Sequence, residues 1–449
     1  MNLYNFLSKN IVYPFSDKIL GRNITKQLNF LSKSQWWSHD KLKEFQLNKL
    51  KSIIEIAYNQ VPYYKEIFSK NQLNPSDIKS IDDLKKIPIL TKDDIIENFP
   101  SKIVNRNIEN IPHYYSESSG STGKQTRYFI DKSAYSLNIA SYLRGWNWMG
   151  YELGDKLIKV SQNTRVSFEK AVQDYINRCK LFTQEYSDGN YEQFINLINK
   201  FSPKILRSYP DPLDFTAKYI LDKKIEISGI HAINTTGNTL NDDKRKLIEQ
   251  AFKAPVFDSY STEGAAVLFE CPTHDCYHLA MEYGIYEVLD NNGNEVKEGE
   301  SGRLITTDLW NTSLPFIRYE TKDIITKSKS TCKCGRGLES YKKILGREND
   351  IIITKNKTIL IGQSFTTYFK HIAEIKQFYI NQTDINDYIF SFVLNNPLSK
   401  DKIIRIENDW KQKIGENPNI KIVIKEFIPE LPSGKIRFVE RNSSIDFKL

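Results

Sequence analysis

The 449-residue sequence contains little of what several large classes of protein require. Its five cysteines are too few and too unevenly spaced for a disulfide framework. No apolar run approaches the roughly 20 residues that cross a bilayer, and the first residues hold no uninterrupted apolar core of a secretion signal. We therefore expect a cytoplasmic protein with reduced thiols and no membrane span. For Trp36 and Trp37, packing against the body is favoured over peripheral contact with a membrane.

Signatures of common enzymes and of nucleic-acid binding are also missing. The patterns Gly-x-Ser-x-Gly, His-Glu-x-x-His and Gly-x-Gly-x-x-Gly do not occur, which argues against the usual serine hydrolases, zinc proteases and dehydrogenases. The net charge is +8, from 63 basic and 55 acidic residues, and the basic residues form no stripe of the kind that binds nucleic acid. Internal repeats and low-complexity linkers are absent from the sequence. Nucleic acid is not an expected partner, and the oligomeric state stays open.

Composition and periodicity predict a folded α/β protein with more than one domain. Hydrophobic residues make up 40% of the chain, which is too long for one compact core. A helical apolar stripe covers residues 40–57 and ends at Val61-Pro62, and Thr91 with Asp94 has the form of a helix-capping box. Further helices are predicted at 191–200 and 242–252, and strands at 155–160, 205–206, 256–257 and 283–289. This alternation favours a largely parallel sheet.

The pattern changes near residue 346. Beyond it, strand, helix and strand are predicted at 388–394, 402–414 and 420–427. About a hundred residues in this order are enough for a small α+β domain. We therefore place one domain at residues 1–345 and a second at 346–449.

The segment from Tyr115 to Lys124, Tyr-Ser-Glu-Ser-Ser-Gly-Ser-Thr-Gly-Lys, is the most informative stretch of the chain. Small hydroxyl residues and two glycines allow the backbone to approach an anion closely, as in loops that bind phosphate. A Walker A loop would need glycine at Ser118 and Ser or Thr at Gln125, so the usual P-loop reading fails. Taken alone, such a loop is more often a plain flexible connection.

Four further segments follow this loop in a fixed order along the chain. They are Asp258-Ser-Tyr-Ser-Thr-Glu263, Arg318-Tyr-Glu-Thr-Lys-Asp323, Gly346-Arg347 with Asp350, and Pro432-Ser-Gly-Lys435-Ile. Together with Ser118–Lys124 they resemble the motifs of the adenylate-forming (ANL) superfamily. The resemblance is greatest to the phenylacetate–CoA ligase-like, CapK-like proteins of capsular polysaccharide loci. It implies a large N-terminal domain with mixed sheets and a small C-terminal lid.

The resemblance assigns a role to each motif. The phosphate loop would comprise Ser118, Ser119, Gly120, Ser121, Thr122, Gly123 and Lys124, and the adenine site Gly237, Tyr260 and Thr262. Glu263 would hold magnesium, Asp323 the ribose hydroxyls, and Lys435 the reacting carboxylate and α-phosphate, with Arg347 at the interdomain hinge. The acyl pocket would lie near Asp211 and Asn238. Two positions depart from the family pattern, with Lys322 in place of glycine and Asn349 in place of a hinge acid.

Each of these residues also has a simpler interpretation. Lys435 could be a solvated turn lysine, Asp323 a helix cap or a surface carboxylate, and Tyr260 a packing residue among 25 tyrosines. The five motifs together favour ATP-dependent activation of a small carboxylic acid to an acyl-adenylate. Transfer would follow to coenzyme A, or to an amine or hydroxyl of an amino acid or sugar, in surface polysaccharide biosynthesis. The alternatives are a non-catalytic nucleotide- or zinc-binding scaffold and an unrelated phosphate-binding transferase.

Two short clusters of cysteine and histidine suggest a metal site. The candidate ligands are Cys271, Cys276, His278, Cys332 and Cys334, of which a tetrahedral zinc would use four. We expect Cys271, Cys332, Cys334 and one of His278 or Cys276, with His278 preferred because relatives have a histidine near there. Four protein ligands would saturate the ion, so the zinc would be structural. Buried free thiols are the alternative, and they are the expected state of Cys179.

Overall fold

A computed structural model describes residues 3–117, 126–160, 174–175, 178–183, 190–328, 332–356, 358–369, 372–415, 417–429, 437–442 and 445. The expected phosphate loop at 118–124 and Lys435 lie outside the described residues. The chain divides into two compact units. Unit 1 comprises Met1–Glu287, Leu304–Thr321 and Lys327–Lys343, and unit 2 comprises Val288–Arg303, Lys322–Thr326 and Ile344–Leu449. The predicted boundary after residue 345 stays a prediction.

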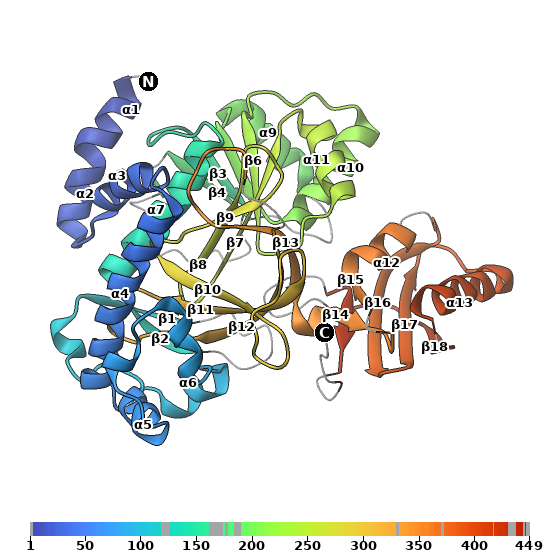
Figure 1. Ribbon diagram of the computed structural model, residues 1–449. Helices are drawn as coiled ribbons and strands as arrows, with labels where there is room; N and C mark the ends of the chain where they lie inside the picture. The colour runs from blue at the N-terminus through green and yellow to red at the C-terminus, as the bar shows by residue number, and fades with distance from the viewer. Residues whose placement is uncertain are drawn as a thin grey trace. The chain divides into compact units, whose positions relative to one another are not determined.

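The first part of unit 1 is helical (Figure 1). Its elements are α1 (Leu3–Leu7), the π-helical turn η1 (Ser8–Val12), α2 (Tyr13–Leu20), α3 (Ile24–Ser34), α4 (His39–Gln60), α5 (Pro62–Lys70), η2 (Pro75–Asp77), η3 (Ile81–Lys86), α6 (Lys92–Asn98) and η4 (Ile108–Asn110). Both predicted helix starts are confirmed. The Ser38 side chain accepts from the Lys41 amide at the start of α4, and Thr91 and Asp94 form the capping box of α6.

The rest of the large region alternates strands and helices. The elements are β1 (His113–Glu117), β2 (Arg127–Asp131), α7 (Lys132–Trp148), β3 (Leu157–Val160), β4 (Cys179–Phe182), α9 (Tyr191–Phe201), β5 (Ile205–Ser208), α10 (Pro210–Lys223), β6 (Ala232–Thr236), α11 (Asp242–Phe252), β7 (Val256–Thr262), β8 (Ala266–Glu270), β9 (Tyr277–Leu279), β10 (Gly284–Leu289), β11 (Ser301–Asp308), β12 (Tyr319–Lys327) and β13 (Ser340–Arg347). The predicted helices at 191–200 and 242–252 are confirmed.

Among the described residues, one eleven-stranded sheet has the order β10-β11-β12-β13-β9-β8-β7-β6-β5-β3-β4. Strands β4, β3, β5, β6 and β7 pair in parallel, whereas β7, β8, β9 and β13 pair antiparallel. The expectation of a largely parallel sheet is therefore right for one half only. Helices α9, α10 and α11 supply the long crossovers that parallel strands need, while the short β7–β8 and β8–β9 connections allow only hairpins.

Alternate residues of the parallel strands face opposite sides of the sheet. Leu157 and Ile205 pack in the core on the side of α7, whereas Ile158 and Leu206 pack with residues of α9, α10 and α11. Helices therefore cover both faces of this part of the sheet (Figure 1). Strand ends that emerge between such layers are the usual place for a ligand site in α/β proteins.

Unit 2 has its own sheet and core. Its elements after β13 are η5 (Glu348–Asp350), β14 (Ile351–Ile353), β15 (Ile359–Ile361), α12 (Gly362–Phe369), β16 (Ile375–Asp384), β17 (Asp387–Leu394), α13 (Lys400–Ile414), β18 (Asn419–Ile424) and β19 (Val439–Arg441). The order β18-β17-β16-β19 confirms a small α+β sheet, and Phe365 and Trp410 stack at 4.1 Å between ring centroids in its core. The last predicted strand ends earlier than expected, at Ile424.

Strand β16 is ten residues long but was not predicted from the sequence. Its buried positions include Phe378, Ile380 and Gln382, so one inward position of the alternation is polar. The Gln382 amide donates to the Ile353 carbonyl at 2.7 Å, and its oxygen accepts from the Ile353 amide at 3.2 Å. These long-range hydrogen bonds compensate for burial of the amide, which local periodicity does not reveal.

The two N-terminal tryptophans differ in their surroundings. Trp37 packs against Phe30 and Phe45, with ring centroids 5.7 and 6.2 Å away, as expected. Trp36 is 56% exposed, with the Arg336 guanidinium 5.0 Å from its ring. None of the helices that the structure describes is long and apolar enough to cross a bilayer.

Candidate functional site

A β-hairpin fixes both ends of the expected phosphate loop. Strands β1 and β2 pair antiparallel up to Glu117 and Arg127, so residues 118–126 connect two adjacent strand ends. The far end of β2 is anchored in unit 1. The buried Asp131 carboxylate accepts from the Ser313 amide at 2.8 Å, and the Asn311 side chain donates to the Phe129 carbonyl at 2.9 Å. These contacts fix the strand ends Glu117 and Arg127, between which the expected loop lies in the sequence.

The end of β7 carries Tyr260, Thr262 and the adjacent Glu263. The Thr262 hydroxyl donates to the Glu263 carboxylate at 3.0 Å. Burial, with a smaller contribution from the charge of Glu263, raises the pKa of Tyr128 on β2 to about 12. Phe316 connects the two segments: its ring centroid lies 5.7 Å from that of Tyr128, and its Cβ lies 3.5 Å from where a Cβ on Gly264 would be. Gly264 is required at the next position, because its φ is +78° and a Cβ there would lie 2.8 Å from the Thr306 hydroxyl.

The turn after β6 is held by a buried ion pair that the motif search did not identify. Gly237 has a φ of +82°, which suits its expected role beside adenine. The next residue, Asn238, donates to the Asp211 carboxylate at 2.6 Å, and Lys244 pairs with the same carboxylate. Burial lowers the pKa of Lys244, but the charge of Asp211 and the hydrogen bond to it outweigh this effect. The pKa of Lys244 is therefore raised overall. The two segments assigned to the acyl pocket by resemblance thus contact each other.

The hinge motif of unit 2 forms a chain of alternating charges. Arg347 Nε lies 3.2 Å from the Asp323 carboxylate, and Arg437 Nε lies 2.9 Å from the Asp350 carboxylate. Burial raises the pKa of Asp350, although both arginines oppose that shift. Arg437, which the motifs did not identify, follows Lys435 by two residues in the sequence, and its own ion pair connects the start of the β19 segment and the hinge within unit 2.

The structure rules out both simpler interpretations of Asp323, a helix cap and a surface carboxylate. Asp323 lies inside β12 and is only 4% exposed, so it is neither a helix cap nor a surface carboxylate. The preceding residue, Lys322, has a φ of +61°. This left-handed conformation explains the family preference for glycine at that position in physical terms.

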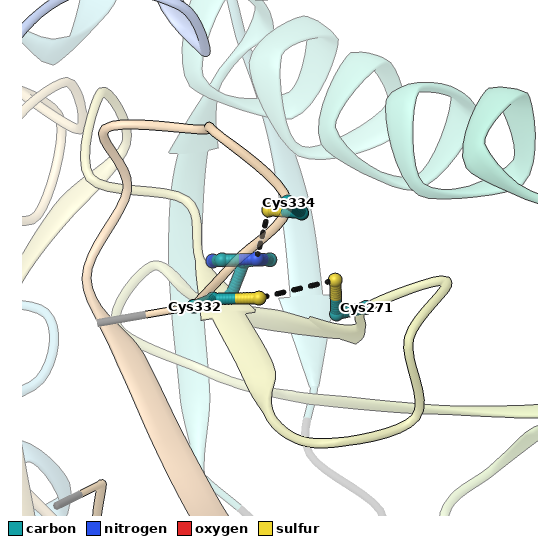
Figure 2. Close-up of side chains that lie close together, drawn as sticks. Cys271, Cys332 and Cys334 are labelled. Carbon is teal, nitrogen blue, oxygen red and sulfur yellow. Dashed lines mark hydrogen bonds between the residues drawn. The ribbon is translucent and has the colours of Figure 1, made fainter. Parts of the chain in front are cut away.

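The structure brings four of the five predicted metal ligands together. The ligand atoms of Cys271, His278, Cys332 and Cys334 all lie within 4.8 Å of one another. Figure 2 shows the three labelled cysteines converging from β8 and the loop before β13. The Cys271 and Cys332 sulfurs are 3.5 Å apart, and His278 Nε2 is 3.1 Å from the Cys334 sulfur.

Three thiols and one imidazole at these separations are compatible with zinc. Zinc–sulfur bonds of about 2.3 Å in a tetrahedron place ligand atoms roughly 3.3–3.8 Å apart, and a disulfide would need about 2.05 Å. Cys276, the fifth candidate, lies beside the group. A hydrogen bond with Cys276 lowers the pKa of the Cys271 thiol against the opposing effect of burial, and raises that of Cys276. Cys179 packs against the main core of unit 1, as expected for a structural thiol.

Comparison with known proteins supports the resemblance that the motifs indicated. Residues 352–442 match the CapK C-terminal domain. The chain is 27% identical over 414 residues to Protein CapK of Staphylococcus aureus, with 89% of each chain covered. It is also 27% identical over 341 residues to phenylacetate-coenzyme A ligase of Pseudomonas putida, covering 73% of this chain and 75% of the relative.

Solved structures show the same fold. A 2-hydroxyisobutyryl-CoA ligase in complex with R3-HIB-AMP superposes with a TM-score of 0.73 at 17% identity, covering 92% of this chain and 93% of the other. The amide bond synthetase McbA from Marinactinospora thermotolerans superposes with a TM-score of 0.51 at 13% identity, covering 72% and 66%. The chain therefore resembles CapK-like and phenylacetate–CoA ligase-like proteins along most of its length, and it has the fold of the adenylate-forming ligases.

Proposed function

We propose that the protein uses ATP to activate a small carboxylic acid as an acyl-adenylate, with release of pyrophosphate, and then transfers the acyl group to an acceptor. The observation that carries this proposal is the position of Glu263. Its neighbour Gly264 and Tyr128 of β2 both lie against Phe316, which supports a magnesium site near the strand that follows the expected phosphate loop in sequence. The similarity to phenylacetate-coenzyme A ligases and the order of the five motifs support the same chemistry.

The residues fit the charge changes of the first step. The substrate carboxylate attacks the α-phosphorus, the bond to the bridging oxygen breaks, and pyrophosphate leaves with the electron pair. Negative charge grows at the α-phosphate, so cations and backbone donors near it lower the barrier. Residues 118–124 would donate backbone hydrogen bonds to the phosphates, and Lys435 would supply a cation at the α-phosphate. Magnesium bound near Glu263 would neutralise phosphate charge.

Asp323 and Arg347 would act on the nucleotide sugar. An ionised Asp323 can accept two hydrogen bonds from vicinal ribose hydroxyls. The guanidinium of Arg347, whose Nε lies 3.2 Å from the Asp323 carboxylate, would hold that carboxylate in one orientation. On the base side, Gly237 and Tyr260 would flank adenine, and the Asp211–Lys244 pair would hold the Gly237 turn through Asn238.

Coenzyme A is the acceptor that the relatives suggest. The Pseudomonas putida relative is named a phenylacetate-coenzyme A ligase. An amine or hydroxyl of an amino acid or sugar is the second possibility, in keeping with the CapK-like resemblance and a role in surface polysaccharide assembly. The finding that would favour it is acyl transfer to a sugar amine without coenzyme A.

The Cys/His cluster is proposed to hold a structural zinc ion. Cys271 begins the turn of the β8–β9 hairpin and His278 lies on β9, whereas Cys332 and Cys334 belong to the loop before β13. Zinc bound by these four would cross-link two segments far apart in sequence. All four positions of a tetrahedral ion would then be taken by protein, which leaves none for substrate.

The test is carboxylate-dependent ATP–pyrophosphate exchange across a library of acids. We expect one acid or a small chemical class to support exchange. Lys435→Ala should slow that exchange by about 10²–10³, the usual cost of one cationic or hydrogen-bond donor at the reacting centre. Lys425→Ala, in the same C-terminal region, is the matched control and should retain the parental rate. If the Lys435→Ala variant exchanged pyrophosphate at the parental rate, the scaffold alternative would be favoured. The same holds if the parent chain showed no exchange with any acid.

A further inference from the structure

The N-terminal helix of unit 1 is amphipathic with its polar side facing inward. Elements α1, η1 and α2 run without a break from Leu3 to Leu20. Its buried polar residues are Asn5, Ser8, Ser16 and Asp17, which are 4%, 1%, 7% and 6% exposed. Its outward apolar residues, which we call the N-terminal ridge, are Leu3, Phe6, Leu7, Ile11, Phe15 and Ile19, exposed by 73%, 48%, 37%, 56%, 65% and 65%. A surface helix normally has the reverse arrangement.

Specific contacts fix this orientation. The Asn5 amide donates to the Asp155 carboxylate at 2.8 Å, and the Asp17 carboxylate accepts from the Thr25 amide at 2.8 Å. Ser8 packs closely against Gly154. A Cβ on residue 154 would lie only 2.6 Å from the Ser8 hydroxyl oxygen. Rotation of the helix to bury its apolar side would break these hydrogen bonds and leave buried polar groups unpaired. The exposed ridge is therefore a consequence of how the helix is docked.

The ridge is continuous and follows helical geometry. Apart from the adjacent pair Phe6 and Leu7, its members follow one another at intervals of three or four residues, so they lie along one side of a helix that is about 27 Å long at 1.5 Å per residue. Figure 1 shows α1 and α2 at the outer edge of unit 1. Single exposed apolar residues are common on proteins, but an aligned row of six marks a surface that another molecule covers.

The charges beside the ridge identify the kind of molecule. Lys9 and Lys18 are exposed on the same helix, and Lys26 and Lys33 are exposed on α3. The one acidic residue among the first 39 is Asp17, which is buried. A basic helix with an aligned apolar side is the pattern of helices that lie in the headgroup region of anionic membranes. A second copy of the chain would bring like charges together.

We propose that the N-terminal ridge docks the protein onto an anionic lipid surface. The apolar side chains would enter the boundary between headgroups and acyl chains, and the lysines would contact lipid phosphates and carboxylates. A convex ridge suits a deformable bilayer, whereas a protein partner would have to offer a groove of matching length. This attachment is peripheral and independent of the adenylation chemistry proposed above.

The test is sedimentation of the full chain with vesicles. We expect binding to phosphatidylcholine vesicles that contain about one third phosphatidylserine, weaker binding at high salt, and little binding to phosphatidylcholine alone. The variant Phe15→Ser/Ile19→Ser should bind at least about tenfold more weakly, because two large apolar side chains no longer enter the bilayer. The variant Lys9→Glu/Lys18→Glu keeps all the apolar residues of the ridge. It should nevertheless lose binding to the anionic vesicles, because its new carboxylates are repelled by the lipid headgroups.

A matched control comes from exposed apolar residues of unit 2. Ile404 and Phe427 are 55% and 69% exposed, and Ile404→Ser/Phe427→Ser should bind vesicles like the parent chain. Equal binding by the Phe15→Ser/Ile19→Ser variant, or no binding by the parent chain, would overturn the proposal. A parent chain that ignores vesicles but dimerises, and a Phe15→Ser/Ile19→Ser variant that is monomeric, would assign the ridge to a second copy instead.

Discussion

Most charged side chains of the hinge in unit 2 are more exposed than the buried charges of unit 1, although Asp323 is only 4% exposed. In unit 1, Asp308 is 2% exposed, and the Arg144–Glu282 ion pair has side chains 3% and 0% exposed. In the hinge of unit 2, the Arg347, Asp350 and Arg437 side chains are 42%, 36% and 17% exposed. Buried charges are costly to rearrange, whereas partly hydrated ones exchange partners readily.

This difference suggests a division of labour. The buried groups of unit 1 would keep the strand ends that carry Tyr260 and Glu263 in one arrangement. The half-exposed charges around Asp350 would suit a segment that must change its contacts, as the resemblance implies for the hinge. Changes in unit 1 should therefore affect stability more than changes in the hinge, and four experiments test this order.

The largest effect is expected at the Cys/His cluster. Cys332→Ser should lose zinc and lower stability by about 3–5 kcal/mol, because the cross-link between β8 and the loop before β13 disappears. Elemental analysis and thermal melting measure both quantities. Cys276→Ser is the control, since Cys276 lies outside the group of four converging ligand atoms. Parental protein that is isolated without zinc and melts no higher than Cys332→Ser would show that the thiols are merely buried.

The second effect concerns a buried carboxylate of unit 1. Burial raises the pKa of Asp308 to about 7, even though its Oδ1 accepts from the Trp310 and Asn311 amides. The folded state therefore binds a proton more tightly than the unfolded state, so stability falls as pH rises from about 4 to 7. Asp308→Asn keeps both hydrogen bonds without the charge. It should be more stable than the parent above pH 7, by about 2–4 kcal/mol, and equal to it near pH 4.

Thermal melting across this pH range measures the difference. Asp82→Asn is the control, because Asp82 is exposed. A constant difference between Asp308→Asn and the parent at every pH would mean that titration of Asp308 is not its source.

A smaller effect is expected at the hinge. A double-mutant cycle with Asp350→Asn and Arg437→Gln should give a coupling of about 1 kcal/mol that weakens with added salt, because both side chains reach solvent. Chemical denaturation at two ionic strengths measures it. A coupling of several kcal/mol that salt does not change would place this pair with the buried charges and remove the contrast between the units.

The smallest effect is expected at Lys322. Its φ of +61° is unfavourable for a side chain with a Cβ, so Lys322→Gly should stabilise the protein by up to about 1 kcal/mol. Lys421→Gly, on the exposed side of β18, should instead destabilise it by about 0.5–1 kcal/mol, because glycine loses more conformational freedom on folding. Thermal melting should show a higher melting temperature than the parent for Lys322→Gly and a lower one for Lys421→Gly. Destabilisation by Lys322→Gly would show that the lysine side chain contributes more than the strain costs.

The sequence by itself determined the local features of the molecule. Helical periodicity and capping residues located α4, α6 and α11, because those signals depend on neighbours within one or two turns. The order of motifs identified the superfamily, since each motif is short and contiguous. The lysine at 322, where the family pattern has glycine, likewise marked a position with a left-handed backbone, whose φ is +61°.

Tertiary structure decided everything that depends on contacts between distant segments. The grouping of His278 with the three cysteines depends on the pairing of β8, β9 and β13, which spacing along the chain does not specify. Arg437 reaches Asp350 only because the chain returns after β18. The N-terminal helix has an ordinary amphipathic sequence, yet its polar side faces inward because Asp155 and Thr25 supply partners there. Periodicity tells which residues share a face, whereas the available hydrogen bonds and packing space determine which face is buried.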